Sequence, residues 1–261
     1  MPINQKSKGM YQRISNISYK LLRKIISALI PPEIVLGRTA CLGQAVVHAK
    51  SSLLYRPSLI NQQKVRCDLF LDWLNGAPRP DANEVKKHLS LDYVLPWIEE
   101  QQQLPWLKQR QAVELFVIDS FAELTDQKFT HKQHGWSFAC NYNDLIHSPE
   151  FTQQFDCHGL LPLKEVETVF SKFFTWLFEH YPNATVLFIH FPTKFDSRVH
   201  FRERAMAIHQ IMTQFATKIP SIKNISLPEE RVQQDTSDSH PYHFAQQTVD
   251  EFAAAWEKNL N

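Results

Sequence analysis

The sequence predicts an α/β fold, specifically a three-layer α/β/α sandwich with a mainly parallel sheet, preceded by a basic amphipathic N-terminal helix. Apolar runs of strand length alternate with helix-like stretches, a pattern typical of a parallel sheet covered on both faces. The length of 261 residues and the hydrophobic content of 43% suit one large packed domain. We therefore expect a basic helical segment at residues 1-30 and a single α/β domain at residues 31-261.

The N-terminal segment carries six basic residues and no acidic one, and its apolar residues recur at helical spacing up to Pro31 and Pro32. Such a helix can lie on an anionic membrane surface or dock into a partner. It can equally pack on the protein's own core. The sequence leaves these alternatives open, with residues 10-30 as the candidate contact to the inner membrane surface.

Four apolar runs predict the strands of the sheet. They are EIVLG at 33–37, VELFVI at 113–118, ATVLFIHF at 184–191 and KNISLP at 223–228. Helices are expected at 40–54, 62–74, 163–181, 199–218 and 243–260, with shorter helical pieces over 84–109 that Pro96 and Pro105 interrupt. Residues 125–160 look irregular and polar.

Polar residues follow the predicted strands where each strand ends. Arg38 and Thr39 follow the first strand, Asp119 and Ser120 follow the second, and the loop DTSDSHPYHF at 235–244 follows the last. In parallel sheets, ligands bind outside the carboxyl ends of the strands. The sequence therefore predicts one site at this edge of the sheet.

The C-terminal loop offers an acid–base pair. One of its histidines, His240 or His243, would act as a general base, and Asp235 or Asp238 would orient the imidazole. The alternative is a polar turn with exposed imidazoles.

A nucleophile is harder to find. Ser120 lies on a turn after a strand, which suits attack, but the local sequence Ser-Phe-Ala-Glu also fits a helix cap completed by Glu123. Thr39 is a hindered alternative that could equally cap a helix. Cys41 is intrinsically nucleophilic, but its apolar neighbours predict a buried and inert thiol.

Several classes of function lack support in the sequence. The four cysteines are scattered without a Cys-x-x-Cys pair, as expected for reduced thiols in a cytoplasmic protein, and no run is long enough to span a bilayer. The acidic body and the absence of a recognition motif argue against nucleic acid. No spacing among the histidines and cysteines of 131–158 matches a zinc pattern, so no metal is expected. No Walker A loop or dinucleotide-binding fingerprint occurs.

Five stretches resemble the SGNH (GDSL-like) hydrolase superfamily, and within it a bacterial branch found among capsule and surface-polysaccharide genes. They are RTACLGQ at 38–44, VRCDLFLDWL at 65–74, FVIDSFAEL at 116–124, FIHFPTKFDSRVHFRERA at 188–205 and PYHF at 241–244. In that superfamily a serine attacks an acyl group, a histidine of the C-terminal loop is its base, and backbone N–H groups with an asparagine bind the oxyanion.

The resemblance implies a set of site residues. His243 is the first choice for the base and His240 the second, with Asp238 or Asp235 as the orienting carboxylate and Ser120 as the candidate nucleophile. Oxyanion or substrate binding is implied for Arg38, Thr39, Asn141, Asn143 and Asp119. The sequence departs from the family at the first strand, because Arg38 and Thr39 stand where the aspartate and the nucleophilic serine are expected.

The resemblance implies an O-acyltransferase or esterase acting on a carbohydrate, with O-acetyl transfer in capsular or surface polysaccharide biosynthesis. No permanently bound cofactor is expected, and acetyl-CoA is the suggested acyl donor. If acyl transfer used direct attack by a sugar hydroxyl, the histidine alone would suffice. The alternative is a catalytically inactive protein of the same fold that binds glycan or scaffolds a polysaccharide-synthesis complex.

Overall fold

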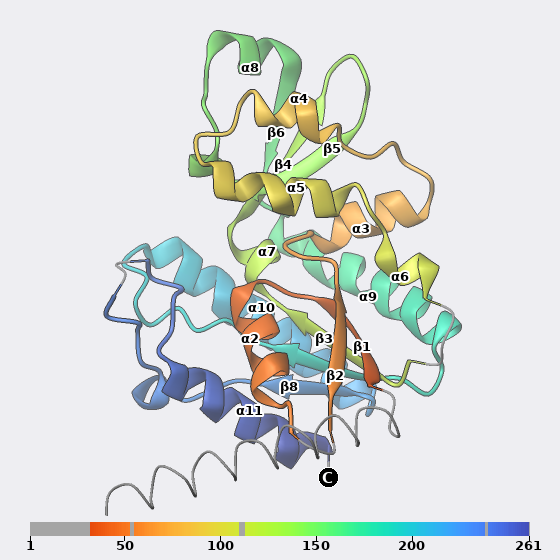
Figure 1. The fold of residues 1–261 in the computed structure, drawn as a ribbon, viewed down its shortest axis with the longest axis vertical. Coiled ribbons are helices and arrows are strands. Elements are labelled where there is room, and N and C mark those ends of the chain that lie inside the picture. The colour runs from red at the N-terminus through yellow and green to blue at the C-terminus, as the bar shows by residue number, and fades with distance from the viewer. Residues whose placement is uncertain (1–31, 53–54, 110–112, 238–239, 261) are drawn as a thin grey trace, which may run out of the picture.

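The computed structural model describes residues 32–52, 55–109, 113–237 and 240–260. The predicted basic helix and Asp238 lie outside the described residues. The central sheet has five strands in the order β2-β1-β3-β7-β8, and every neighbouring pair is parallel (Figure 1). The strands are β1 (Glu33–Arg38), β2 (Pro57–Asn61), β3 (Leu115–Asp119), β7 (Thr185–Ile189) and β8 (Ile222–Ile225).

Helices cover both faces of this sheet, because alternate strand residues point to opposite sides. Leu36, Phe116 and Phe188 pack with α3 (Cys67–Leu74), α9 (Leu163–His180) and α10 (Val199–Lys218). Val35, Val117 and Leu187 pack on the other side with α2 (Cys41–Ala49) and α11 (Gln246–Leu260). The predicted α/β class with a mainly parallel sheet and helical layers is confirmed.

A second, smaller sheet stands beside the first in Figure 1, and the sequence did not predict it. Its three antiparallel strands have the order β5-β4-β6 and are β4 (Asp126–His131), β5 (Ser137–Asn141) and β6 (Phe155–Gly159). Aromatic residues such as Phe129 and Phe138 pack beneath α4 (Ala82–Lys86), α5 (Leu95–Gln101) and α8 (Pro149–Gln154). The prediction of irregular structure over 125–160 was therefore wrong, because polar residues alternate with these buried aromatic ones.

Two more differences lie near the first strand. The edge strand β2 was missed, since its five residues are all only half-buried and lack a continuous apolar run. The helix predicted at 62–74 begins only at Cys67, because residues 62–66 form the turn that joins β2 to α3.

The remaining short elements connect these layers. They are η1 (Asp92–Val94), α6 (Pro105–Lys108), α7 (Phe121–Thr125), η2 (Tyr142–Asp144) and η3 (Glu229–Arg231). Within the described ranges, no helix is both long and apolar enough to cross a membrane.

Candidate functional site

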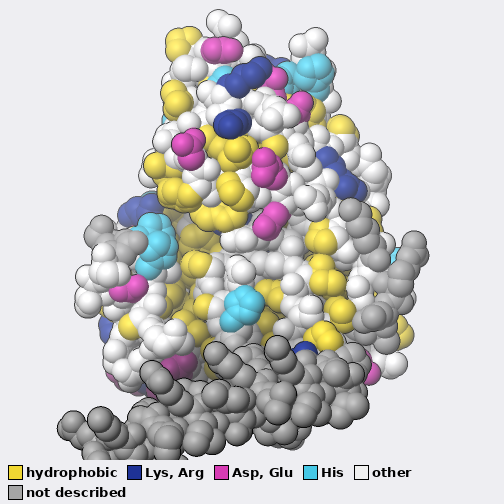
Figure 2. All heavy atoms as spheres, in the orientation of Figure 1, with side chains coloured by type: hydrophobic (Ala, Val, Ile, Leu, Met, Phe, Trp, Pro, Cys, Tyr) yellow, Lys and Arg dark blue, Asp and Glu magenta, His cyan; other side chains and the backbone are white. Residues whose placement is uncertain are grey.

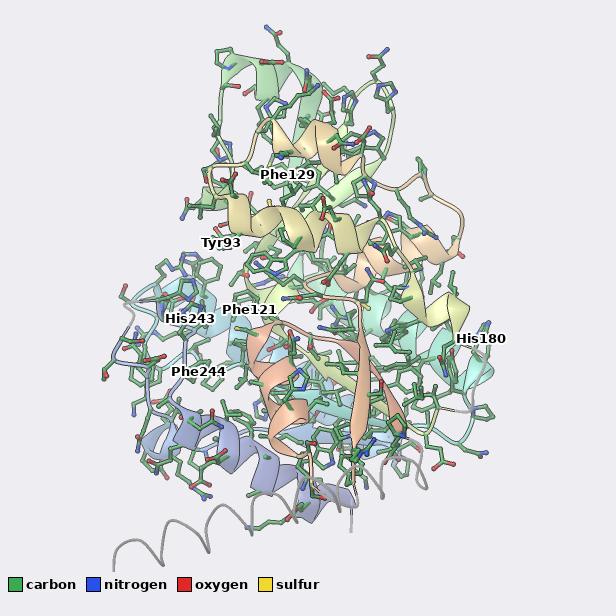
Figure 3. All side chains as sticks on the ribbon, in the orientation of Figure 1. Tyr93, Phe121, Phe129, His180, His243 and Phe244 are labelled. Carbon is green, nitrogen blue, oxygen red and sulfur yellow. The ribbon has the colours of Figure 1, made fainter. Side chains whose placement is uncertain are left out.

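A cavity of about 320 Å³ lies at the carboxyl ends of the strands, between the two sheets and the C-terminal loop. The start of α2, the β2–α3 turn, α5, β5 and the C-terminal loop all contribute to it. Figure 3 shows His243, Phe121 and Tyr93 approaching one another there from three different segments. The lining residues are Ala40, Cys41, Gln63, Lys64, Tyr93, Trp97, Phe121, Asn141, Asp144, His240 and His243.

The two predicted histidines therefore reach one cavity. Their rings are 4.4 Å apart between centroids, and both residues are exposed. The backbone N–H of Tyr242 donates to Nδ1 of His240 over 3.4 Å, a long bond that favours the proton on Nε2 of that ring. Nδ1 of His240 is therefore engaged by the loop's own backbone, and the preference for His243 as the base stays a prediction.

Tyr242 anchors the loop between these histidines. Its side chain is 2% exposed, and its hydroxyl donates to Asp196, which also accepts two bonds from the Arg198 guanidinium. Burial alone would raise the pKa of Asp196, but the bonds from Arg198 and Tyr242 outweigh it and lower this pKa to about 2. The charged carboxylate thus fixes the loop from a segment 46 residues away in sequence.

Of the two aspartates predicted to orient a histidine, Asp235 lies within the described residues and Asp238 does not. Oδ1 of Asp235 accepts from the backbone N–H and the hydroxyl of Ser237, as in an Asx turn. The backbone N–H of Asp235 donates to the carbonyl of His243, so this residue shapes the loop through its main chain.

Cys41 places a thiol on the wall of this cavity. It is the first residue of α2 and is exposed there, contrary to the expectation of a buried thiol. Crowding by the surrounding protein raises the pKa of the thiol by desolvation, and the charge of Asp119 adds to this. The Leu42 N–H and the charge of Lys64 oppose the increase. The raised pKa keeps the thiol protonated near neutral pH, so attack requires a base.

Asp119 lies beneath the start of α2 rather than in the cavity. Its carboxylate oxygens accept the backbone N–H groups of Ala40 at 2.6 Å and of Phe121 at 3.1 Å, and so fix the starts of α2 and α7. Burial raises the pKa of Asp119 to about 7 despite these two bonds. Gly43 leaves room for this arrangement, because a Cβ there would lie 2.8 Å from Oδ2 of Asp119.

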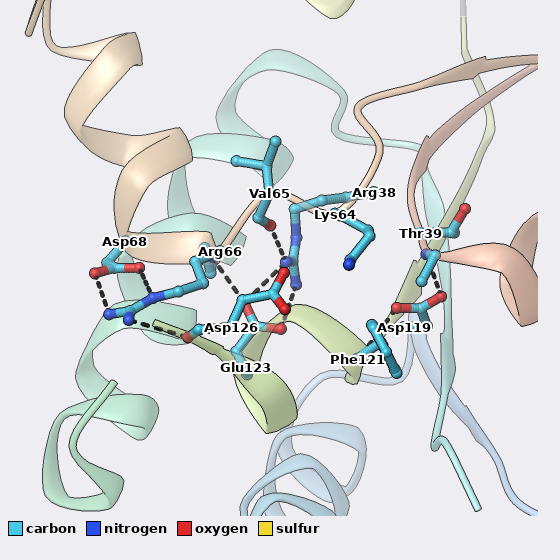
Figure 4. Close-up of polar contacts among 12 residues, drawn as sticks. Arg38, Thr39, Lys64, Val65, Arg66, Asp68, Asp119, Phe121, Glu123 and Asp126 are labelled. Carbon is cyan, nitrogen blue, oxygen red and sulfur yellow. Dashed lines mark hydrogen bonds and ion pairs between the residues drawn. The ribbon is translucent and has the colours of Figure 1, made fainter. Parts of the chain in front are cut away.

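Arg38 takes a structural role instead of binding an oxyanion. Its side chain is 1% exposed, and Nη1 and Nη2 donate to the two carboxylate oxygens of Glu123 at 2.8 and 3.2 Å (Figure 4). Nη1 also donates to the carbonyl of Val65 at 2.6 Å. Arg38 is not among the residues that line the cavity, so the predicted oxyanion contact is replaced by a buried ion pair that joins β1 to α7.

The hydroxyls of Ser120 and Thr39 also make hydrogen bonds within the fold. The hydroxyl of Ser120 accepts the backbone N–H of Phe191 at 3.0 Å, and its residue is 4% exposed. It stands at the N-cap position of α7 but makes no side-chain cap bond, so the predicted cap with Glu123 does not form. Thr39 is 1% exposed and donates through both its N–H and its hydroxyl to the side chain of Asn61. Neither hydroxyl lines the cavity.

Asn141 and Asn143 lie where the cavity continues into a second one of about 470 Å³. Oδ1 of Asn141 accepts the backbone N–H of Asn143, which leaves the amide NH2 of Asn141 as the donor end. Asn141 lines both cavities and Asn143 only the second, which also contains Asp196 and Arg198. Figure 2 shows histidine side chains at the C-terminal loop on one side of this region and hydrophobic side chains near η1 and α5 on the other.

A larger cavity of about 530 Å³ lies elsewhere, between α3, the small sheet and α9. Its cations are already neutralised, since Arg66 pairs with Asp68 and Lys128 pairs with Asp72. It also lacks a thiol and both loop histidines, so we place the candidate site at the Cys41 cavity.

Sequence reasoning missed Lys64, Tyr93, Trp97 and Asp144, and it undervalued Cys41. The signal for Cys41 was its position just after the first strand, where a helix begins at the ligand-binding edge of a parallel sheet. The other four come from the β2–α3 turn, η1, α5 and η2, none of which was predicted as part of the site.

Comparisons with known proteins give structural neighbours only. No family model matches the chain, and no curated protein does. One similar solved structure is a Streptococcus pneumonia protein provisionally described as a platelet activating factor, 8% identical over 99% of this chain and 100% of that one, with a TM-score of 0.46. Another is an acetyl xylan esterase from the rumen bacterium Butyrivibrio proteoclasticus, 10% identical over 88% of this chain and 64% of that one, with a TM-score of 0.46. Function is therefore inferred from the chain's own side chains.

Proposed function

We propose that the chain is an acyl-transfer enzyme, an esterase or O-acyltransferase, whose nucleophile is the thiol of Cys41. The observation that carries the proposal is that this thiol and the imidazoles of His240 and His243 line one cavity at the carboxyl edge of the sheet. A thiol beside a base in a pocket is the arrangement that nucleophilic catalysis of acyl transfer requires.

The chemistry proceeds in two halves. A loop histidine, with His243 preferred, takes the proton of the Cys41 thiol as sulfur attacks the acyl carbonyl, and the carbonyl electron pair moves onto oxygen. Collapse of this tetrahedral intermediate re-forms the C=O bond and expels the leaving group, to which the imidazolium returns the proton. Water or an acceptor hydroxyl then attacks the thioester in the same way and releases the Cys41 thiol.

Donors for the oxyanion are available on the same wall. The first backbone N–H groups of a helix have no partner within the helix, and Cys41 is the first residue of α2. The amide NH2 of Asn141, whose oxygen is already engaged by Asn143, adds a side-chain donor. These groups support the part of the earlier prediction that assigned an asparagine to this role.

A carbohydrate acceptor suits the adjoining cavity. Tyr93 is 58% exposed and can stack on a sugar ring, and Asn143 and the Asp196–Arg198 pair offer polar groups for hydroxyls. We therefore propose O-acyl transfer to or from a sugar, with acetyl-CoA as a donor and surface polysaccharide biosynthesis as the setting. The contrasting proposal is a glycan-binding protein of the same fold without catalysis.

Intact-protein mass spectrometry after incubation with p-nitrophenyl acetate or acetyl-CoA tests the proposal. We expect one added acetyl group, mapped to the peptide that contains Cys41, and none in Cys41→Ala. Cys157→Ala is the matched control, because Cys157 is also exposed but lies on β6 outside the cavity. His243→Ala should slow acetylation. An unmodified protein under all conditions would refute the thioester route and favour the glycan-binding alternative.

A further inference from the structure

Lys64 lies on the wall of the Cys41 cavity and has an unusual backbone conformation. It lies in the turn between β2 and α3, and among the described residues it alone has a positive φ without being glycine, at 49°. The left-handed region is unfavourable for a side chain such as lysine, and residues that remain there tend to cluster at functional sites. The strained backbone of Lys64 is therefore a reason to ask what function its side chain has.

The ammonium group of Lys64 is packed against aromatic rings and forms no ion pair with a described carboxylate. The residue is 8% exposed, and Nζ lies 4.1 Å from the ring centroid of Trp97 and 5.3 Å from that of Phe121. The described residues contain eight ion pairs, and Lys64 takes part in none of them. Aromatic faces attract a cation but leave its donors unused by a carboxylate.

Two carboxylates interact with the charge of Lys64 without forming an ion pair with it. The positive charge of Lys64 opposes the desolvation that raises the pKa values of Asp126 and Asp144, and neither carboxylate pairs with it directly. The same charge opposes the increase in the pKa of the Cys41 thiol. Lys64 and Cys41 also line the same cavity, so the ammonium and the sulfur border the space in which negative charge develops during attack.

We propose that Lys64 is a catalytic residue whose ammonium stabilises the oxyanion formed when the Cys41 sulfur attacks an acyl carbonyl. The inference rests on the proposed function. Negative charge appears on the carbonyl oxygen only in the tetrahedral intermediate, so a fixed cation in a largely buried wall lowers the barrier to that step. The strained turn and the two aromatic rings position the cation.

Two reactions of the same thiol separate this role from a structural one. Acetylation by p-nitrophenyl acetate passes through an oxyanion, whereas alkylation by iodoacetamide is a direct displacement of iodide at carbon and forms none. In Lys64→Met, which keeps the apolar stem, we expect the acetylation rate constant of Cys41 to fall by roughly 100- to 1,000-fold. The alkylation rate constant should change by less than about 10-fold, through the thiol pKa alone.

Three further variants act as controls. Lys64→Arg keeps the charge and should retain acetylation within about 10-fold of the unaltered protein. Lys64→Gly relieves the left-handed backbone and should melt at a higher temperature than Lys64→Met, yet acetylate as slowly. Lys128→Met removes a cation that faces the other large cavity and should leave both rates unchanged.

Each contrary outcome has a distinct meaning. Equal loss of acetylation and alkylation in Lys64→Met would show that Lys64 only positions Cys41, and unchanged acetylation would show that its charge is not used. Either result overturns the inference while the acyl-transfer proposal stands. If Lys64→Met does not fold, slow acetylation in Lys64→Arg with normal alkylation overturns it. Absence of acetylation in the unaltered protein defeats the proposed function, and the role of Lys64 with it.

Discussion

Replacing Arg38 by methionine should destabilise the protein strongly without removing a group from the candidate site. The substitution leaves the Glu123 carboxylate, which is 0% exposed on its side chain, with a backbone N–H from Cys67 at 2.7 Å but without its cation. Removing one partner of a buried ion pair costs about 3–5 kcal/mol. The carbonyl of Val65 loses its 2.6 Å donor as well.

The cost should appear as a large fall in melting temperature. For a domain of this size, 1 kcal/mol corresponds to a shift of about 2–4 °C, so a cost of about 3–5 kcal/mol should lower the melting temperature by roughly 6–20 °C. The assay is thermal or urea unfolding followed by tryptophan fluorescence. The double variant Arg38→Met/Glu123→Gln should be more stable than Arg38→Met alone, because the orphaned charge is gone.

Two results would refute this account of Arg38. A loss of stability below about 1 kcal/mol would mean that the pair is not the buried contact described. Normal stability combined with lost acetylation of Cys41 would restore Arg38 as a group that acts on substrate. Iodoacetamide labelling of Cys41, measured well below the melting temperature, should proceed at the rate of the unaltered protein.

Three other changes probe the groups around the site. Tyr242→Phe removes the hydroxyl bonded to Asp196; it should lower the free energy of unfolding by about 1–3 kcal/mol and slow acetylation, as measured by urea unfolding and mass spectrometry. Gly43→Ala should cost about 1–3 kcal/mol and slow Cys41 labelling, since its Cβ would lie 2.7 Å from a Thr39 carbon; labelling at the normal rate would contradict the crowding. Asp119→Asn should flatten the dependence of stability on pH. The native Asp119 carboxyl keeps its proton up to about pH 7, whereas the unfolded one releases it near pH 3.8. Stability should therefore fall by up to about 4 kcal/mol as pH rises through this window, as urea unfolding at several pH values would show. Asp126, with its pKa raised to about 6 by burial, should leave a smaller slope in the variant, and an unchanged slope would exclude Asp119 as the source.

Local patterns determined the elements that are long or strongly apolar. The helix at 199–218 was predicted with its observed bounds, and the one at 163–181 differs from α9 by a single residue. The buried strands β3 and β7 were found because a run of consecutive apolar residues bounded by polar ones is a local signal. The edge strand β2 and the antiparallel strands β4, β5 and β6 were missed, since polar residues within them interrupt any continuous apolar run.

The candidate site also has one part that the sequence predicted and another that it did not. The sequence by itself determined that His240 and His243 follow the last strand at the edge where ligands bind, and the cavity includes both. Only the tertiary structure decided which polar groups face that cavity, because burial depends on contacts between distant segments. Glu123 neutralises Arg38 from 85 residues away, and Phe191 occupies the hydroxyl of Ser120 from 71 residues away. The place of Cys41 after the first strand was a local signal, but the packing of α2, α5 and the C-terminal loop decided that Lys64 also lines the cavity.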